Sequence, residues 1–384
     1  MSLYGRDDEV RLIIEDLKAN RLVVVTGESG LGSTTLLEEG VLPELRQQGV
    51  IALSFRQWQG RKFVTVLRQA IADAVNMHAE EHFSPENDSL EKILHRALAL
   101  TGRPVVLLLD QFEDYLRAHT RTHLAEEFDA ELSNAIASHY GKILIALQEH
   151  SLESFGRLSQ NVPNLLGYRL ALRPFTPEAA RQAVQGEVAR CGMEIDPAVT
   201  EALISCPAAA CGSGVRPFSL MRGVTRLIEA EGRLNSSVVS QATLEGHGGP
   251  DRAILESFDA QIGELNKNQT ELLFRWWTIL ISPEQLRLSL TEQALTEYAG
   301  RLNRFVPATL AKLEAMNLLR TFEAGEVTRY EISHEYLTPV IRDWWQRREL
   351  AMIARQRAQF RVRSLSVAGG CIVSVYVLWL LLSK

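Results

Sequence analysis

The sequence has few of the features that mark secreted or zinc-stabilised proteins. Its 384 residues include four cysteines, and no two of them have the C-x-x-C spacing: Cys191, Cys206, Cys211 and Cys371. This pattern excludes a zinc site built on paired cysteines and a disulfide framework, and it fits a reducing compartment such as the cytoplasm. Residues 1–16 are charged and contain no long apolar run, so no secretory signal peptide is predicted.

An excess of positive charge is also lacking. The formal net charge is −6, which argues against a protein built mainly to bind nucleic acid, although a local basic patch remains compatible with it. We find neither an internal repeat nor a low-complexity tract. The length allows two or three domains.

One long uncharged stretch stands at the C-terminus, at residues 364–383. About 20 apolar residues suffice to cross a bilayer as a helix. Arginines are frequent in the preceding residues 349–363, so the positive-inside rule predicts a single-pass protein whose N-terminal domains are cytoplasmic. These arginines would face anionic lipid headgroups. The alternative is a buried helix of a soluble core, but apolar residues occupy every face of the stretch.

The first half of the chain alternates between β-branched runs and amphipathic segments, which predicts a parallel sheet with helices on both faces. The expected strands are 21–26, 50–55, 104–109, 142–147 and 168–172. The expected helices are 6–20, 34–45, 63–76, 90–100 and 125–138.

After Pro174 the pattern predicts helices only, until two strand-like runs return near the end. The expected helices are 177–190, 197–205, 217–231, 290–299 and 306–315, and the expected strands are 318–323 and 328–332. Helices followed by a hairpin predict a winged helix. Its candidate recognition helix contains one cation, Lys312, so packing and autoinhibition are favoured over DNA binding.

The first predicted strand is followed by a glycine-rich turn that is typical of a P-loop. The turn runs from Gly27 to Thr34 and reads GESGLGST. Gly27, Gly30 and Gly32 allow the backbone amides to face an anion, and the helix that starts beyond them adds its dipole. Thr34 is placed to bind Mg²⁺. Together with Ser33 and Thr35, these residues are the candidate phosphate site.

A second acidic motif supports the P-loop interpretation. The buried run PVVLLL ends in Asp110, as in a Walker B element that holds Mg²⁺. Glu113 and Asp114 follow, and one of them could polarise a water molecule. The alternative for Asp110 is a simple cap at the end of a strand.

These motifs resemble the STAND class of signal-transducing P-loop NTPases, and most closely the bacterial novel STAND type. The resemblance extends over residues 5–337. In this chain, Gly5-Arg6-Asp7 resembles the entry motif of the family. Residues 110–114 are similar to the family's acidic motif, and residues 330–337 are similar to the end of its winged helix.

The resemblance implies roles for three more residues. Arg6 would lie near the nucleotide, which is ATP or ADP with Mg²⁺. Pro217 would pack on adenine from the helical domain, although a proline that starts a helix is the alternative. His334 would contact the diphosphate and lock a closed state, unless it is a histidine of the core.

The sequence departs from this family at two cations. Ser33 replaces the phosphate-binding lysine, by natural or engineered substitution, and Gln148 stands where arginine is usual. Both changes remove positive charge from the presumed γ-phosphate, where electrostatic stabilisation provides most of the catalysis. We therefore predict nucleotide binding with weak or absent hydrolysis.

The resulting hypothesis is a nucleotide-gated switch on a membrane. An unidentified protein trigger would promote homo-oligomerisation and cluster the membrane helices, in bacterial defence or stress signalling. The alternatives are an active membrane-tethered ATPase and a nucleotide-free interaction scaffold. The expected divisions are an NTPase domain (1–173), a helical domain (174–247), a winged helix (248–348), a basic segment (349–363) and a transmembrane helix (364–383).

Overall fold

The structure is a computed structural model that describes residues 3–352 with short gaps. The gaps are at residues 59, 61, 86–87, 120–121, 213, 235, 251–252, 254–257, 259–260, 282–287, 317, 325–326, 334–336, 339 and 343.

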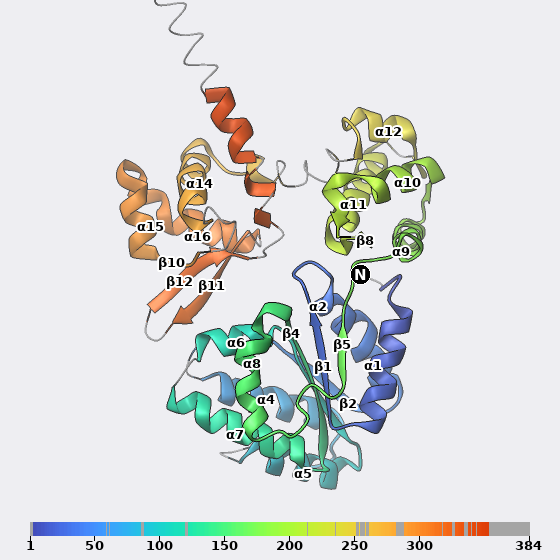
Figure 1. Cartoon of the computed structure of the whole chain (residues 1–384), viewed down its shortest axis with the longest axis vertical. Helices are drawn as coiled ribbons and strands as arrows, with labels where there is room; N and C mark the ends of the chain where they lie inside the picture. The colour runs from blue at the N-terminus through green and yellow to red at the C-terminus, as the bar shows by residue number, and fades with distance from the viewer. Residues whose placement is uncertain are drawn as a thin grey trace, which may run out of the picture.

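A five-stranded sheet forms the centre of the N-terminal part, with the strand order β2-β3-β4-β1-β5 (Figure 1). All four neighbouring pairs are parallel. The strands are β1 (Leu22–Gly27), β2 (Ile51–Phe55), β3 (Val105–Leu109), β4 (Gly141–Gln148) and β5 (Arg169–Ala171). Helices cover both faces, so the predicted α/β P-loop fold is confirmed.

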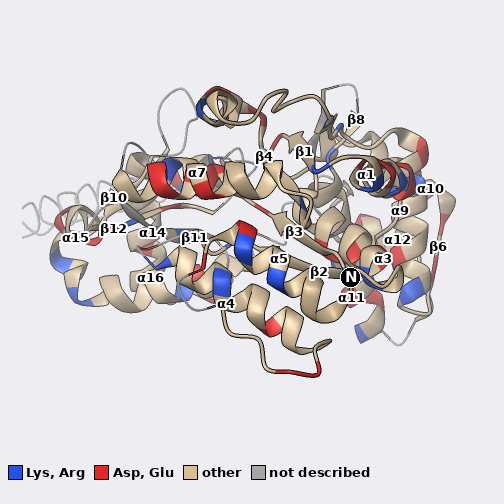
Figure 2. Ribbon diagram, turned by 90° about the horizontal axis from the view of Figure 1, so that it is seen from below, with Lys and Arg blue, Asp and Glu red and all other residues tan. Residues whose placement is uncertain are grey.

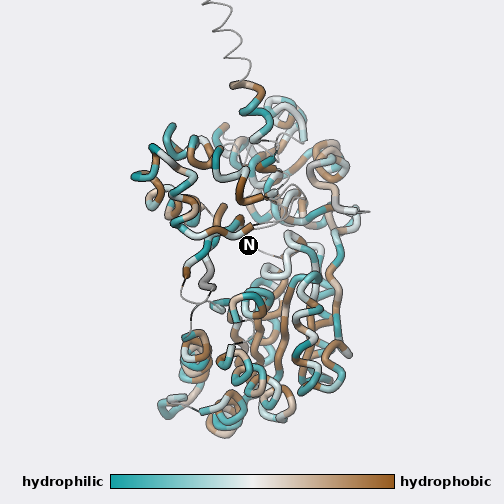
Figure 3. The backbone as a smooth tube through the Cα atoms, turned by 60° about the vertical axis from the view of Figure 1, so that its left-hand side comes forward, coloured by the Kyte–Doolittle hydropathy of each residue, from teal (hydrophilic) through white to brown (hydrophobic). Residues whose placement is uncertain are grey.

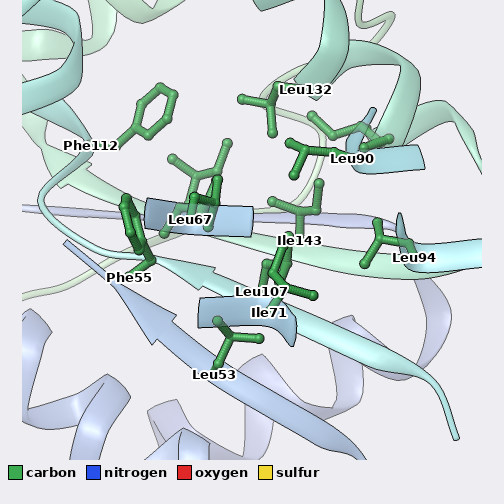
Figure 4. Packing of buried hydrophobic residues seen from close by; sticks show 14 of the residues in the cluster. Leu53, Phe55, Leu67, Ile71, Leu90, Leu94, Leu107, Phe112, Leu132 and Ile143 are labelled. Carbon is green, nitrogen blue, oxygen red and sulfur yellow. The ribbon is translucent and has the colours of Figure 1, made fainter. Parts of the chain in front are cut away.

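The apolar strands bury side chains on both faces of this sheet. Val24 and Leu107 point into one hydrophobic cluster, whereas their neighbours Val23 and Leu108 point into the other. Figure 4 shows the first cluster, in which Leu67 of helix α4 (Phe63–Asn76) packs over strand residues such as Leu53. Figure 3 colours the backbone by hydropathy, and the strands at the centre of this part are mostly in the brown of hydrophobic residues. Complete burial of one such side chain contributes about 1.5–3 kcal/mol.

The helices around the sheet lie close to where the periodicity predicts them. They are α1 (Asp7–Ala19), α2 (Ser33–Thr35), α3 (Leu42–Gln47), α4 (Phe63–Asn76), α5 (Leu90–Thr101), α6 (Phe112–Ala118), α7 (His123–Ala137) and α8 (Leu152–Phe155), with 3₁₀ turns η2 (Glu149–Ser151) and η3 (Gly156–Gln160).

The helix predicted at 34–45 is not regular. It consists of α2, a π-helical segment η1 (Leu36–Val41) and α3. Pro43 is the second residue of α3 and has no N–H to donate to the carbonyl four residues earlier, so the α-helical pattern cannot pass through it unchanged. Such π-helical segments are rare in proteins, and many of those that occur lie near functional sites.

The middle part is mainly helical and has its own hydrophobic cluster, which includes Val184, Leu203 and Leu220. Its helices are α9 (Pro177–Arg190), α10 (Pro197–Ser205), η4 (Pro207–Ala209), α11 (Pro217–Arg233) and α12 (Gln241–Gly246). The expectation of helices only was wrong, because β6 (Glu194–Ile195) pairs with β9 (Val238–Val239), and β7 (Ala210–Cys211) pairs with β8 (Gly214–Val215). Two-residue strands are too short to show a periodic pattern.

The C-terminal part combines helices with a small antiparallel sheet, in the strand order β10-β12-β11. Its elements are α14 (Lys267–Leu280), β10 (Leu290–Thr291), α15 (Glu292–Ala299), η5 (Gly300–Phe305), α16 (Val306–Ala315), β11 (Leu319–Ala324) and β12 (Val327–Ile332). The helix predicted from residue 290 begins only at Glu292, because Thr291 caps it through a hydrogen bond from the Ala294 N–H.

The predicted membrane segment at 364–383 lies outside the described residues. Within the described part of residues 3–352, which excludes those gaps, no helix combines the length and the apolar character that a bilayer crossing requires.

Candidate nucleotide-binding site

The glycine-rich turn joins β1 to α2 at the carboxyl end of the sheet (Figure 1). Gly30 and Gly32 have φ angles of 84° and 86°, a left-handed conformation that glycine adopts without strain. Gly27 ends β1, where an added Cβ atom would lie 3.1 Å from the side chain of Leu172. The sequence GESGLGST thus folds as the tight turn that a P-loop requires.

The two predicted magnesium ligands meet across the site. The Thr34 hydroxyl donates a hydrogen bond of 2.7 Å to Oδ2 of Asp110. Ser33 and Thr35 flank Thr34 in α2 and are half-buried. A hydroxyl and a carboxylate are oxygen donors of the kind that Mg²⁺ takes from proteins, with phosphates and water completing its shell. The pair therefore fits Mg²⁺, and in the described part of the chain no larger cluster of acidic, His or Cys ligands accompanies it.

Burial raises the pKa of Asp110, whose side chain is almost fully enclosed. The hydrogen bonds from Thr34 and from the Gln111 N–H oppose this effect, and so does the positive charge of Arg56. Gln111 itself has a φ angle of 52°, in the left-handed region that non-glycine residues rarely adopt. Local strain of this kind costs about 1–3 kcal/mol and is common at functional sites.

Glu113 lies beside Gln148 at the ends of β3 and β4. Oε2 of Glu113 accepts a hydrogen bond of 3.2 Å from the Gln148 N–H. Oε1 of Gln148 is buried and has no hydrogen-bond partner among the described residues, so it is an acceptor that a bound group could satisfy. Burial raises the pKa of Glu113 to about 7; the charge of Asp114 adds to this effect and Arg320 opposes it.

Asp114 has a different role from Glu113, because it takes part in ion pairs. Its carboxylate lies 2.9 Å from Arg320 of β11 and 3.3 Å from Arg117 of its own helix. Glu331 of β12 is 2.6 Å from Arg320 and 2.5 Å from Arg117. This four-residue network joins α6 to the C-terminal sheet. Glu113 is not a member of this network.

Three successive carbonyl groups of the P-loop accept hydrogen bonds from distant parts of the chain. The Ser29 carbonyl accepts from Arg216 at 2.6 Å and the Gly30 carbonyl from the Phe218 N–H at 3.3 Å. The Leu31 carbonyl accepts from Arg6 at 3.1 Å. The loop is therefore braced from outside by the N-terminus and by the start of α11.

The predicted residues Arg6 and Pro217 both lie at this brace. Arg6 is 4% exposed; it also donates to the Arg173 carbonyl at 2.7 Å, and it stacks over the Phe175 ring. Its guanidinium is thus committed to protein groups. Pro217 is buried at the first turn of α11, between the two residues that contact the loop. His334 lies outside the described residues.

Sequence reasoning missed Arg56, Arg216 and the two arginines of the ion-pair network, and it did not foresee that Asp114 would pair with them. The contacts of Arg216 and of the network span about 200 residues, so no local pattern could indicate them. A signal for Arg56 existed, since it directly follows a predicted strand of the parallel sheet and the carboxyl ends of such strands form the ligand site.

Replacement of Glu113 by glutamine should stabilise the fold above neutral pH. The folded pKa is about 7 and the ordinary value is 4.5, so folding takes up a proton between these values and stability falls as the pH rises through this window. The ionised carboxylate then costs about 3 kcal/mol above pH 7, which the variant avoids. In thermal unfolding, the melting temperature of Glu113→Gln should exceed that of the unaltered chain at pH 8 and differ little from it at pH 5. The control is Glu126→Gln, which changes an exposed acid. If Glu113→Gln and the unaltered chain show the same dependence of melting temperature on pH, the buried Glu113 carboxylate does not destabilise the fold.

The chain resembles one protein family and several solved structures. A family model described as novel STAND NTPase 1 matches residues 2–367. The Walker-type ATPase PABY2304 of Pyrococcus abyssi has a similar fold, with a TM-score of 0.50 and 14% identity, over 88% of this chain and 96% of that one. The ADP form of Aeropyrum pernix ORC2 gives a TM-score of 0.48 and 12% identity, over 90% and 95% of the two chains. No curated protein matches the sequence.

Proposed function

Because the chain belongs to the novel STAND NTPase family, we propose that its P-loop domain is the nucleotide-controlled part of a signalling switch. Nucleotide binding itself follows from the family and from the P-loop fold. The further step is that the bound nucleotide sets the position of the C-terminal part. The ion-pair network between α6 and the C-terminal sheet carries this proposal, since α6 begins two residues after Asp110.

The network is suited to a closed state that can open. Its two carboxylates are nearly buried, with 13% of the Asp114 side chain and 5% of the Glu331 side chain exposed. Opening would return both arginines and both carboxylates to water, so the loss of attraction is partly offset by solvation. A change at the nucleotide that moves α6 would therefore alter a contact of moderate strength.

We assign the chemistry of the site to residues at or beyond the carboxyl ends of β1, β3 and β4. Thr34 and Asp110 would hold Mg²⁺, which when bound neutralises charge on the β- and γ-phosphates. Glu113 and the unpartnered oxygen of Gln148, which are joined through the Gln148 N–H, would orient an attacking water. With serine at position 33 and glutamine at 148, the phosphate lacks two cations, so we propose slow or absent ATP hydrolysis.

We propose the domain division that the sequence suggests: 1–173, 174–247 and 248–348, followed by a basic segment at 349–363. A winged helix at 248–348 is supported by α14, α15 and α16 together with the three-stranded sheet. A DNA-binding role is not favoured, because Lys312 of α16 donates its hydrogen bond to the Glu264 carbonyl. In Figure 2, basic and acidic residues are interspersed over the helices that face the viewer.

The nucleotide content of the purified chain tests the switch. We expect stoichiometric ADP after denaturation and chromatography, and calorimetric binding of ADP and ATP to the emptied protein. Asp110→Asn should lose the magnesium-dependent part of this affinity, whereas Asp73→Asn, which removes an exposed acid of α4, should not. A well-folded chain that neither retains nor binds nucleotide would contradict the proposal and would favour a scaffold.

We also propose a single-pass membrane anchor at residues 364–383, homo-oligomerisation upon activation by a protein trigger, and a role in bacterial defence or stress signalling. The composition of the C-terminal stretch and its preceding arginines support the anchor. Flotation of the full chain with lipid vesicles should be lost when residues 364–384 are removed. If the shortened chain keeps all cellular activity, the membrane does not belong to the function.

A further inference from the structure

Arg56 occupies an unusual position at the carboxyl edge of the sheet. It directly follows β2, whose last residue, Phe55, is paired with Leu109 of the neighbouring strand β3. Strands in a sheet lie about 4.8 Å apart, so Arg56 begins one strand spacing away from Asp110. The side chain is exposed, and it forms no hydrogen bond or ion pair with any residue that the structure describes.

The backbone around Arg56 is fixed by contacts to Asp110. The Phe55 carbonyl accepts a hydrogen bond of 2.8 Å from the Asp110 N–H. The indole of Trp58 donates a hydrogen bond of 2.6 Å to the Asp110 carbonyl, and Trp58 is fully buried among the rings of Phe55, Phe63 and Phe112. Arg56 is therefore an exposed cation held by rigid neighbours on both sides. Its charge is also near enough to lower the pKa of Asp110 against the effect of burial.

Other arginines at this edge have different surroundings. Arg216 and Arg6 donate to P-loop carbonyls, and Arg169 is bonded to Thr26 and Glu149. Arg173 is exposed, but it follows β5, which lies on the opposite side of β1 from Asp110. Among these described arginines, Arg56 is the one with both an uncommitted charge and a fixed place beside Asp110.

We propose that Arg56 binds the terminal phosphate of a nucleoside triphosphate and replaces the cation that is missing at Ser33. Thr34 and Asp110 would hold a metal that neutralises charge on the β- and γ-phosphates, so a bound γ-phosphate would lie near Asp110. Arg56 would approach that phosphate from the β2 side, whereas a lysine at position 33 would approach it from the P-loop. An arginine can donate two parallel hydrogen bonds to phosphate oxygens. This assignment rests on the proposed nucleotide function.

Calorimetric titration of the emptied full-length chain with Mg-ATP and Mg-ADP tests the assignment. Arg56→Ala should weaken ATP binding about tenfold or more, the size expected for a hydrogen bond to a charged group. ADP binding should change little, so the preference for ATP over ADP falls. Arg56→Lys should recover part of the affinity. Arg103→Ala removes an equally exposed arginine at the opposite, amino end of β3, and it should leave both affinities unchanged.

The outcomes separate this assignment from the function on which it rests. If the unaltered chain binds nucleotide and Arg56→Ala has the same ATP and ADP affinities, Arg56 is not a phosphate ligand and the switch proposal stands. Equal losses for ATP and ADP would also overturn the contact with the terminal phosphate. If the unaltered chain binds neither nucleotide, both proposals fail. Circular dichroism of each variant confirms that the fold is retained.

Discussion

Replacement of Ser33 by lysine is expected to raise ATP turnover about a hundredfold, the effect of restoring one strong electrostatic contact to the transition state. Ser33 is half-buried in the first turn after Gly32, directly before Thr34, which we propose as a magnesium ligand. A lysine there would reach the β- and γ-phosphates, as in P-loop proteins generally. The acid Glu113 and the pair of Thr34 and Asp110 are already in place, so the missing positive charge is the main deficit.

Release of inorganic phosphate from saturating Mg-ATP measures this effect. Ser33→Gln is the matched control, because glutamine is long and polar but carries no charge. Glu113→Gln added to Ser33→Lys should return the rate to that of the unaltered chain. A lysine variant no faster than the glutamine variant would mean that the site lacks more than a cation, and the interpretation as a weakened ATPase would be wrong.

Replacement of Arg320 by alanine should shift the chain from its closed arrangement toward an open one. Arg320 is 19% exposed and binds both Asp114 and Glu331, which lie on opposite sides of the contact between α6 and the C-terminal sheet. Removal of one member of a buried ion pair costs about 3 kcal/mol, a factor of about 100 in the balance between closed and open states. Arg117 still bridges the two carboxylates, and therefore limits the effect.

Small-angle scattering and limited proteolysis of the nucleotide-bound protein would detect the opening as a larger radius of gyration and faster cleavage. Arg329→Ala is the matched control, because Arg329 lies on β12 and donates to the Ser289 carbonyl within the same C-terminal part. If the Arg320→Ala protein is as compact and as resistant to proteolysis as this control, the ion-pair network does not take part in the switch.

The sequence indicated the parts of the fold that depend on local patterns. Apolar runs predicted the parallel sheet, and prolines at 177, 197 and 217 marked the first residues of α9, α10 and α11. The P-loop and the Walker B motif predicted that Thr34 and Asp110 share a magnesium site, and a hydrogen bond joins the two side chains in the structure. By contrast, α14 was not predicted, although Asn266 and Gln269 form a capping box at its start.

Long-range partners could not be predicted in the same way. The pairing of Arg320 with Asp114 joins positions 206 apart in the chain, and neither residue belongs to a recognisable motif with the other. The same holds for Arg216 and the Ser29 carbonyl, since a backbone acceptor leaves no trace in the sequence. The raised pKa of Glu113 likewise depends on burial that only packing creates.

The brace on the P-loop has a consequence for synthesis of the chain. Arg216 binds the Ser29 carbonyl across a separation of 187 residues. A ribosome adds roughly 5–20 residues per second, so roughly 10–40 seconds pass between the making of the loop and the making of its brace. During that interval the nascent P-loop has its glycines but lacks two of its three outer hydrogen bonds. We expect it to capture nucleotide firmly only after α11 has emerged, so the five-stranded sheet would be complete before the chain holds its ligand, while the C-terminal sheet would still have to be made.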